Sequence, residues 1–326
     1  MKKILIALWL VSVAGQAKPV QVGLVLDKGG KDDKSFNSAA YKGATEAKEK
    51  LGIELKVVES SDDSALEPAL RTFAQRGYNL VIGIGFVQAD AVKKVAQQFP
   101  KTHFLIVDSH VDLPNVRSVI FKEHEGAFLV GYIGALTSKT ATLGFVGGMD
   151  IPLIRRFEFG YRAGALAARP EAKVLVNYVG STTDAWKNPT KGKELALSQY
   201  QKGADIIFAA AGASGNGVFD AAEEKKAMAI GVDSNQNWIK PGRILTSMLK
   251  RVDLAVFEAV ELETRTTFKA GKFSLGMKEG MIDYALDSHN RSILTPEVEK
   301  LANAMKSKIL SRSVKVPDYY EMKPNS

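Results

Sequence analysis

The sequence contains no cysteine in 326 residues and only four histidines. Without cysteine the chain can form no disulfide, thiolate metal site or cysteine nucleophile, and it has no cysteine to carry a lipid anchor. The four histidines, His103, His110, His124 and His289, show no metal-ligand spacing, and no Gly-x-Ser-x-Gly motif is present. We therefore expect no catalytic residue, no metal site and no cofactor.

Long hydrophobic runs are also missing, since no segment approaches the roughly 20 apolar residues of a membrane-spanning helix without charges. A shorter run, residues 4–13, follows a basic start and precedes small residues. This order is typical of a cleavable signal peptide, here residues 1–17. We predict a periplasmic protein that begins near Lys18 and has no lipid anchor.

Neither sign of charge dominates, because 44 basic residues stand against 36 acidic ones for a net charge of +8. The basic residues are scattered along stretches such as 42–50 and 300–308 and do not alternate with aromatic residues in clusters. Such stretches are usually solvated helix faces. We therefore expect no nucleic-acid partner.

Short β-branched runs alternate with longer amphipathic stretches from residue 20 onward, a pattern that predicts βαβ units and parallel sheets. Strands are expected at 20–26, 54–59, 80–84, 103–107, 116–121, 142–146, 173–179, 205–209 and 227–232. Helices are expected at 36–51, 65–76, 89–99, 123–136, 153–168, 191–201, 217–225 and 252–268. The predicted fold class is α/β, with two Rossmann-like lobes of parallel sheet facing each other across a ligand cleft.

The domain boundaries follow from this division of the strands. Residues 18–123 are expected to form the N-terminal lobe and residues 124–248 the C-terminal lobe. Residues 249–326 are more than the second sheet needs, so we expect them to cross back and complete the N-terminal lobe.

Ligands of open parallel sheets lie beyond the carboxyl ends of the strands, which makes the loops there informative. Asp27, Asp108 and Asp233 each follow a predicted strand, and Phe36 and Asn37 enter the first helix. A single aspartate in such a place is often a helix cap. Three are better explained by one shared polar ligand that carries hydroxyl or N–H donors.

Other readings of these loops stay open at this point. Ser35 can cap the first helix, and Phe36 with its charged neighbours can be a hydrophobic staple beside a solvated turn. The glycine-rich stretches 144–150 and 212–217 suit an anion or a tight turn, and we favour the turn. Asp27, Asp32 and Asp33 resemble the calcium-binding start of nucleoside hydrolases, although interleaved lysines oppose a cation there.

Several segments, in order along the chain, resemble the basic membrane protein family of bacterial substrate-binding proteins, the purine nucleoside receptors of ABC transporters. The segments are 32–37 (DDKSFN), 125–131 (EGAFLVG), 144–157, 189–194 (PTKGKE) and 249–253 (LKRVD). The resemblance implies a type I periplasmic binding protein architecture. It also implies a purine nucleoside ligand (inosine, guanosine or adenosine), an ABC transporter permease as partner, and a monomer.

The resemblance further implies which part of the ligand each cleft residue binds. Phe36 would stack on one face of the base and Trp186 on the other, unless Trp186 only packs on its own lobe. Asp27, Asn37 and Asp108 would bind the edges of the base. Asp233 and Lys250 would bind the ribose hydroxyls. The backbone at Gly212 would border the sugar.

Two positions depart from the family pattern. Ala17 and Lys18 stand where most members carry a lipid-anchoring cysteine, and Asn188 stands where an acidic residue is usual. Within the segment 144–157, Arg155 and Arg156 are expected to pair with nearby acidic residues, Glu158 or Asp150.

Three alternative functions remain. The protein could be a calcium-dependent hydrolase, a receptor subunit for a membrane signalling protein, or the sensing core of a transcription regulator. The last alternative needs a DNA-binding head.

Overall fold

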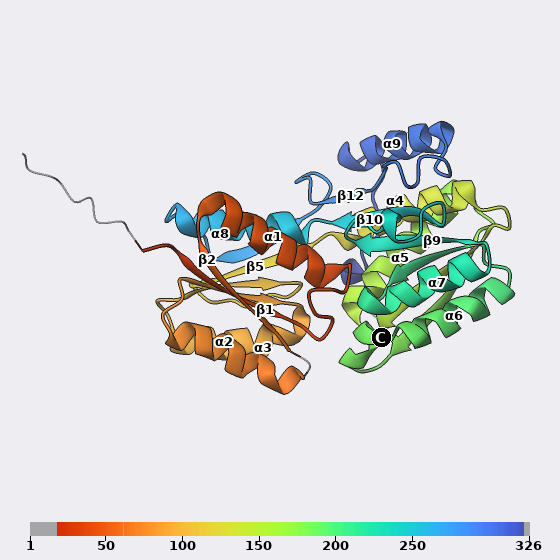
Figure 1. Ribbon diagram of the computed structural model, residues 1–326. Helices are drawn as coiled ribbons and strands as arrows, with labels where there is room; N and C mark the ends of the chain where they lie inside the picture. The colour runs from red at the N-terminus through yellow and green to blue at the C-terminus, as the bar shows by residue number, and fades with distance from the viewer. Residues whose placement is uncertain (1–17, 61, 323–326) are drawn as a thin grey trace, which may run out of the picture.

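The computed structural model describes residues 18–60 and 62–322. The predicted signal peptide, residues 1–17, lies outside the described residues. Two α/β lobes stand side by side (Figure 1). The predicted fold class is confirmed.

The first lobe contains, within the described residues, a six-stranded parallel sheet in the order β11-β5-β4-β3-β1-β2. Its strands are β1 (Gln21–Leu26), β2 (Glu54–Glu59), β3 (Leu80–Ile84), β4 (His103–Val107), β5 (Val116–Phe121) and β11 (Gly271–Leu275). Figure 1 shows helices α1 (Phe36–Leu51) and α8 (Val252–Thr264) on one face and α2 (Leu66–Gln75) and α3 (Ala89–Gln98) on the other. Because helices cover both faces, the central strand β3 is apolar throughout, and every one of its residues is buried.

The second lobe repeats this plan in the order β12-β10-β9-β8-β6-β7, with β12 antiparallel to β10. Its strands are β6 (Thr142–Met149), β7 (Lys173–Gly180), β8 (Ile206–Ala210), β9 (Met228–Asp233), β10 (Ile244–Lys250) and β12 (Ile282–Tyr284). Its helices are α4 (Glu123–Thr137), α5 (Pro152–Ala168), α6 (Pro189–Gln201), α7 (Gly215–Glu224) and α9 (Pro296–Leu310). Helix α4 packs against α5, α6 packs against α7, and α9 lies on the outside of α4.

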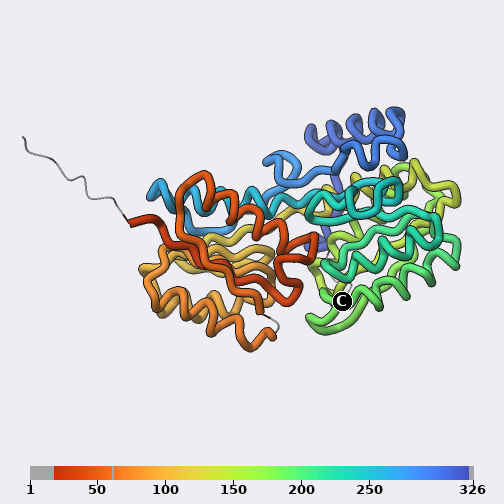
Figure 2. Tube along the Cα trace, viewed as in Figure 1, coloured from red at the N-terminus to blue at the C-terminus, as the bar shows by residue number. Residues whose placement is uncertain are grey.

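The expectation for residues 249–326 requires a correction. Helix α8 and strand β11 do lie in the first lobe, where β11 pairs with β5. Strand β12 pairs with β10 and α9 packs on α4, so the chain after residue 281 returns to the second lobe. Figure 2 shows this return as the dark-blue end of the tube. The physical reason is that β10 has an open edge that β12 covers.

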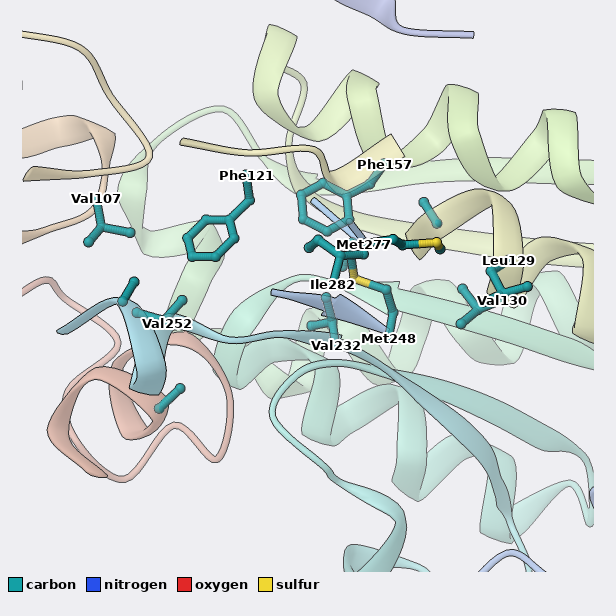
Figure 3. Packing of buried hydrophobic residues seen from close by; sticks show 14 of the residues in the cluster. Val107, Phe121, Leu129, Val130, Phe157, Val232, Met248, Val252, Met277 and Ile282 are labelled. Atoms are coloured by element: carbon teal, nitrogen blue, oxygen red, sulfur yellow. The ribbon is translucent and has the colours of Figure 1, made fainter. Parts of the chain in front are cut away.

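The described chain passes between the lobes at Lys122, at Arg251 and over residues 276–281. Backbone bonds join the crossings, because Lys122 N donates to Leu275 O at 2.8 Å and Arg251 N donates to Met281 O at 2.9 Å. Buried apolar side chains from both lobes meet around the crossings (Figure 3). The crossings are therefore part of a continuous hydrophobic core.

No helix of the described segments combines the length and the apolar character needed to cross a membrane.

Candidate functional site

A pocket with about 580 Å³ of free space, part of it open to solvent, lies between the lobes at the carboxyl ends of their strands. All eight residues predicted from the sequence line this pocket: Asp27, Phe36, Asn37, Asp108, Trp186, Gly212, Asp233 and Lys250. The amino end of α5 adds an apolar wall that the sequence did not single out, namely Leu153, Ile154 and Phe157.

Asp27 and Asn37 are fixed in a hydrogen-bond network at the start of α1. Asn37 Nδ2 donates to Asp27 Oδ1 at 2.7 Å and to Asp33 Oδ2 at 2.9 Å. The Asp33 carboxylate also accepts from the backbone N–H groups of Ser35, Asn37 and Ser38. Asp33, and not Ser35, therefore satisfies the free N–H groups at this helix end, which corrects the expected cap.

Asp27 is half-buried as a residue and lines the pocket. Burial away from bulk water raises the pKa of Asp27 to about 6, although the bonds from Gly29 and Asn37 lower it. Asp27 is thus ionised at neutral pH at a cost in free energy. A donor that pairs with this carboxylate would offset that cost.

Aromatic rings reach the pocket from both lobes, Phe36 from α1 and Trp186 from the short helix Thr183–Lys187. Trp186 lies against β6, where a Cβ on Gly148 would fall 2.0 Å from its ring. Gly148 is therefore needed for close approach of the indole. The predicted tight turn at 144–150 is wrong, because residues 142–149 form strand β6. Gly212 does adopt a turn conformation, with φ 55°.

Asn188, where the family usually has an acidic residue, begins α6. Its side-chain oxygen accepts from Lys191 N at 3.0 Å. Asn188 is not among the residues that line the pocket. The departure from the family pattern therefore preserves a helix cap.

Asp108 and Asp233 occupy equivalent places at the ends of β4 and β9, and both have left-handed backbones, with φ of 66° and 65°. Lys250 Nζ lies 2.5 Å from Asp108 Oδ2, while Asp108 Oδ1 is buried and has no hydrogen-bond partner within the described residues. The second oxygen of a buried carboxylate needs a donor. Asp108 is thus positioned to accept from a ligand.

The charges in this part of the pocket act on one another. Burial raises the pKa of Asp233 to about 7, against the lowering effect of Lys250 and of the hydrogen bond from Ser35. Burial alone would lower the pKa of Lys250, but Asp108, Glu123 and Asp233 together raise it above its ordinary value. Lys250 therefore stays an ammonium, and it is already committed to carboxylate partners.

The lobes are in contact on both sides of the pocket. On one side Ser35 Oγ donates to Asp233, and Gln236 Nε2 donates to Lys34 O at 2.9 Å. On the other side Lys28 Nζ lies 2.5 Å from the Asp184 carboxylate. The described residues therefore form a closed cleft.

The calcium-site alternative does not fit this geometry. Asp33 is used by the N-terminus of α1, and the Asp32 side chain is 89% exposed and next to Lys31. No group of three or more histidine, aspartate or glutamate side chains converges as a metal site within residues 18–60 and 62–322. A hard cation needs several such oxygens at once.

Arg155 and Arg156 differ in their partners. Arg155 pairs with Asp150 at 2.6 Å and with Glu158 at 3.4 Å, as predicted. Arg156 instead points inward to Glu123 and to Asp318, far along the chain, so the expectation for Arg156 is wrong. The reason is that neighbouring positions on a helix face about 100° apart, and of these two positions 156 faces the core.

Two lobes of mostly parallel sheet, joined by crossings and closed over a polar pocket at their strand ends, have the type I periplasmic binding protein architecture. The family model "ABC transporter substrate-binding protein PnrA-like" matches residues 20–319. The chain belongs to this family, the Bmp or basic membrane protein family. The family description, a substrate-binding protein of an ABC transporter, implies a small-molecule ligand and a transporter partner.

Individual proteins support the same assignment. "Basic membrane protein A" of Borreliella afzelii is 37% identical, with 91% of each chain covered. An "uncharacterized lipoprotein" of Pyrococcus furiosus is 35% identical over 82% of this chain and 71% of its own length. The crystal structure of an ABC transporter solute-binding protein from Aeropyrum pernix superposes with a TM-score of 0.83 at 29% identity, over 92% of this chain and 94% of that one.

Proposed function

We propose that the protein captures a purine nucleoside, such as guanosine, inosine or adenosine, in this pocket and delivers it to the permease of an ABC transporter. The observation that supports the proposal is a pocket between the lobes with an aromatic ring from each lobe and carboxylates at its polar positions. Aromatic rings suit a flat base, and carboxylates suit its N–H groups and the hydroxyls of a ribose.

The charge of the pocket favours a neutral ligand. Four carboxyl groups line it, Asp27, Asp33, Asp108 and Asp233, and Lys250 is the lining ammonium. Because Lys250 is paired with Asp108 and neighbours Glu123, the described lining residues leave no cation over for a phosphate. We therefore infer that a nucleoside binds and a nucleotide does not.

We propose the roles within the pocket that the family resemblance implies, and the position of each group is compatible with them. Asp27 and Asn37 lie at the entrance of α1 beside Phe36 and would read the base edge together with Asp108. Asp233 and Lys250 lie at the ends of β9 and β10 in the second lobe and would bind the ribose, next to the turn at Gly212.

The test begins with the purified protein, which is denatured so that any released small molecule can be identified by mass spectrometry. Calorimetric titration with guanosine and guanosine monophosphate then measures selectivity. We expect nucleoside binding, with the monophosphate weaker by at least about tenfold, since a desolvated like-charge contact costs more than about 1.4 kcal/mol. Absence of nucleoside binding in both experiments would reject the proposal.

The same preparation tests capture without turnover. Incubation with inosine, guanosine or adenosine should leave the nucleoside intact on chromatography. Steady release of free base that a chelator stops would instead support the calcium-dependent hydrolase.

We further propose that the protein acts as a monomer in the periplasm, cleaved near Ala17 and without a lipid. N-terminal sequencing and the intact mass of protein from a periplasmic extract test the cleavage and the lipid. Size-exclusion chromatography with light scattering tests the oligomeric state. A lipid-sized mass increase would place this chain with the relative named a lipoprotein.

A further inference from the structure

A line of alternating charges runs from the pocket to the C-terminal segment of the chain. Lys250 Nζ lies 3.3 Å from Glu123 Oε1, and Glu123 Oε2 lies 2.8 Å from Arg156 Nη1. Arg156 then holds both oxygens of Asp318 through Nε and Nη2, at 2.8 and 2.6 Å. Four elements thus supply one residue each: the end of β10, the start of α4, the helix α5 and the segment after α9.

Burial makes these charges depend on one another. Lys250, Glu123 and Arg156 are 2%, 1% and 4% exposed. Charges withdrawn from water interact strongly, and a buried ion that loses its partner is left uncompensated. Lys250, Glu123 and Arg156 each have oppositely charged partners on two sides. Loss of one charge therefore changes the electrostatic interactions of the next residue in the series.

The link between Lys250 and Glu123 is the longest of the series, at 3.3 Å. If Asp318 loses its charge, Glu123 becomes the remaining carboxylate of the series on the Arg156 guanidinium. Glu123 is then drawn toward Arg156, its contact with Lys250 weakens, and Lys250 keeps Asp108 as its ion-pair partner. The ammonium that lines the pocket consequently shifts, although nothing in the pocket has been altered.

The C-terminal segment is built to hold Arg156. Asp318 Oδ1 also accepts from Tyr320 N at 3.1 Å, and the Tyr320 ring lies over the Arg156 guanidinium at 4.7 Å. Tyr319 packs against Phe159 of the same helix α5, with ring centroids 5.1 Å apart. The guanidinium is therefore bonded at its edge and covered on its face by one short stretch of chain.

The charge series lies next to the crossings between the two lobes. Glu123 follows the first crossing between the lobes and Lys250 precedes the second. Arg156 Nη1 also donates to Phe121 O, the last residue before the first crossing. The same guanidinium thus contacts the backbone at the first crossing and, through Glu123, a pocket side chain.

We propose that Arg156 and Asp318 are positioning residues for the ligand pocket: acting through Glu123, they hold the Lys250 ammonium in place, so that residues 318–320 set the ligand affinity of a site they do not touch. The binding part of this proposal rests on the nucleoside function proposed above. The placement of Lys250 does not.

The first experiment therefore needs no ligand. A buried, hydrogen-bonded ammonium exchanges its protons slowly, so Lys250 should give a resolved side-chain ¹⁵N–¹H signal, identified by its loss in Lys250→Arg. Asp318→Asn, which keeps the size of the side chain and removes its charge, should shift or broaden this signal. The control is Glu321→Gln, which removes a carboxylate of the same segment from an exposed pair with Lys315 and should leave the signal unchanged.

The second experiment measures guanosine and guanine affinity by calorimetry. Asp318→Asn should weaken guanosine by roughly 3- to 30-fold, the range expected for coupling between separated sites, with much less effect on free guanine. Glu321→Gln should bind like the wild type. Tyr320→Leu, a milder change that uncovers the guanidinium, should weaken guanosine in the same direction and serves if Asp318→Asn does not fold.

The outcomes separate the proposals. A lower melting temperature in Asp318→Asn with unchanged guanosine affinity and an unchanged Lys250 signal would show that the contact only stabilises the fold, and would overturn the positioning role. If the wild type binds no nucleoside, the proposed function fails, while the Lys250 signal still decides whether Asp318 positions the ammonium.

Discussion

Asp27 and Asn37 bond to each other in both directions. The Asp27 backbone N–H donates to Asn37 Oδ1 at 3.1 Å, and Asn37 Nδ2 donates to Asp27 Oδ1 at 2.7 Å. Since Nδ2 also donates to Asp33, both hydrogens of the Asn37 amide are used within the protein. The side chains of Asp27 and Asn37 can therefore bind a ligand only through their oxygen atoms, as hydrogen-bond acceptors.

This arrangement predicts a preference among purines. Guanine and hypoxanthine carry a hydrogen on N1, whereas adenine presents a bare N1 acceptor that would face the Asp27 carboxylate. A hydrogen bond to a charged group contributes about 1.5–3 kcal/mol, so guanosine and inosine should bind at least about tenfold more tightly than adenosine. Calorimetric titration at pH 8 measures the order. Equal or tighter binding of adenosine would contradict it.

Replacing Asp27 by asparagine should stabilise the unliganded protein while it weakens binding. Burial raises the folded-state pKa of Asp27 to about 6 from an ordinary 3.8, so the folded protein binds a proton more readily than the unfolded chain. Stability from this group is present below about pH 4 and is lost as the pH rises through about 6. An asparagine side chain cannot ionise, so the gain at pH 8 should be about 1–3 kcal/mol.

Thermal unfolding of Asp27→Asn at pH 4 and pH 8 measures this difference, and the gain should be present at pH 8 and small at pH 4. Asp32→Asn is the matched control, since Asp32 is an exposed carboxylate of the same loop. A gain in both variants, or a gain that is largest at pH 4, would show that burial of Asp27 is not its source.

Phe36 should contribute stacking that does not depend on which base is bound. Stacking is worth about 1–3 kcal/mol per base, so Phe36→Ala should weaken every nucleoside by roughly ten- to a hundredfold. Phe36→Leu keeps apolar volume without a ring and should lose most of the same affinity. If Phe36→Leu binds like the wild type, the ring only fills space.

Asp233 should distinguish a nucleoside from its free base. Asparagine is the informative replacement because it tolerates the left-handed backbone at this position better than alanine does. Asp233→Asn should weaken guanosine by about 1.5–3 kcal/mol and leave guanine nearly unchanged. Titration with guanosine, deoxyguanosine and guanine decides this, and equal losses for nucleoside and base would mean that the sugar end is assigned wrongly.

Gly148 should be needed for the position of Trp186. A methyl group there would fall 2.0 Å from the indole, so Gly148→Ala must displace the ring from the pocket wall. We expect at least about tenfold weaker nucleoside binding, in line with the loss of one stacking face. Gly180→Ala is the control, since its Cβ would meet Ala185 of the same short helix at an ordinary 3.4 Å. Equal effects of the two variants would point to strain in the lobe instead.

The sequence by itself determined the alternation of strands and helices and the convergence of the pocket residues. Strand and helix periodicity are local, and the predicted strands that end at Asp27, Asp108 and Asp233 are found with bounds close to those expected. Because parallel strands end at one edge of a sheet, residues that follow them meet without any knowledge of their distance. Trp186, Gly212 and Lys250 were placed there by the family resemblance, and β10 itself was not predicted.

Only the tertiary structure decided how the chain is completed and which charges meet. The return of β12 and α9 to the second lobe depends on which sheet edge is open, and a sequence carries no periodic signal for that. The pairing of Arg156 with Asp318 joins residues 162 positions apart, and nothing at either position marks the other. Local periodicity sets which face of a helix is buried, but the partner that a buried charge finds there depends on how distant segments pack.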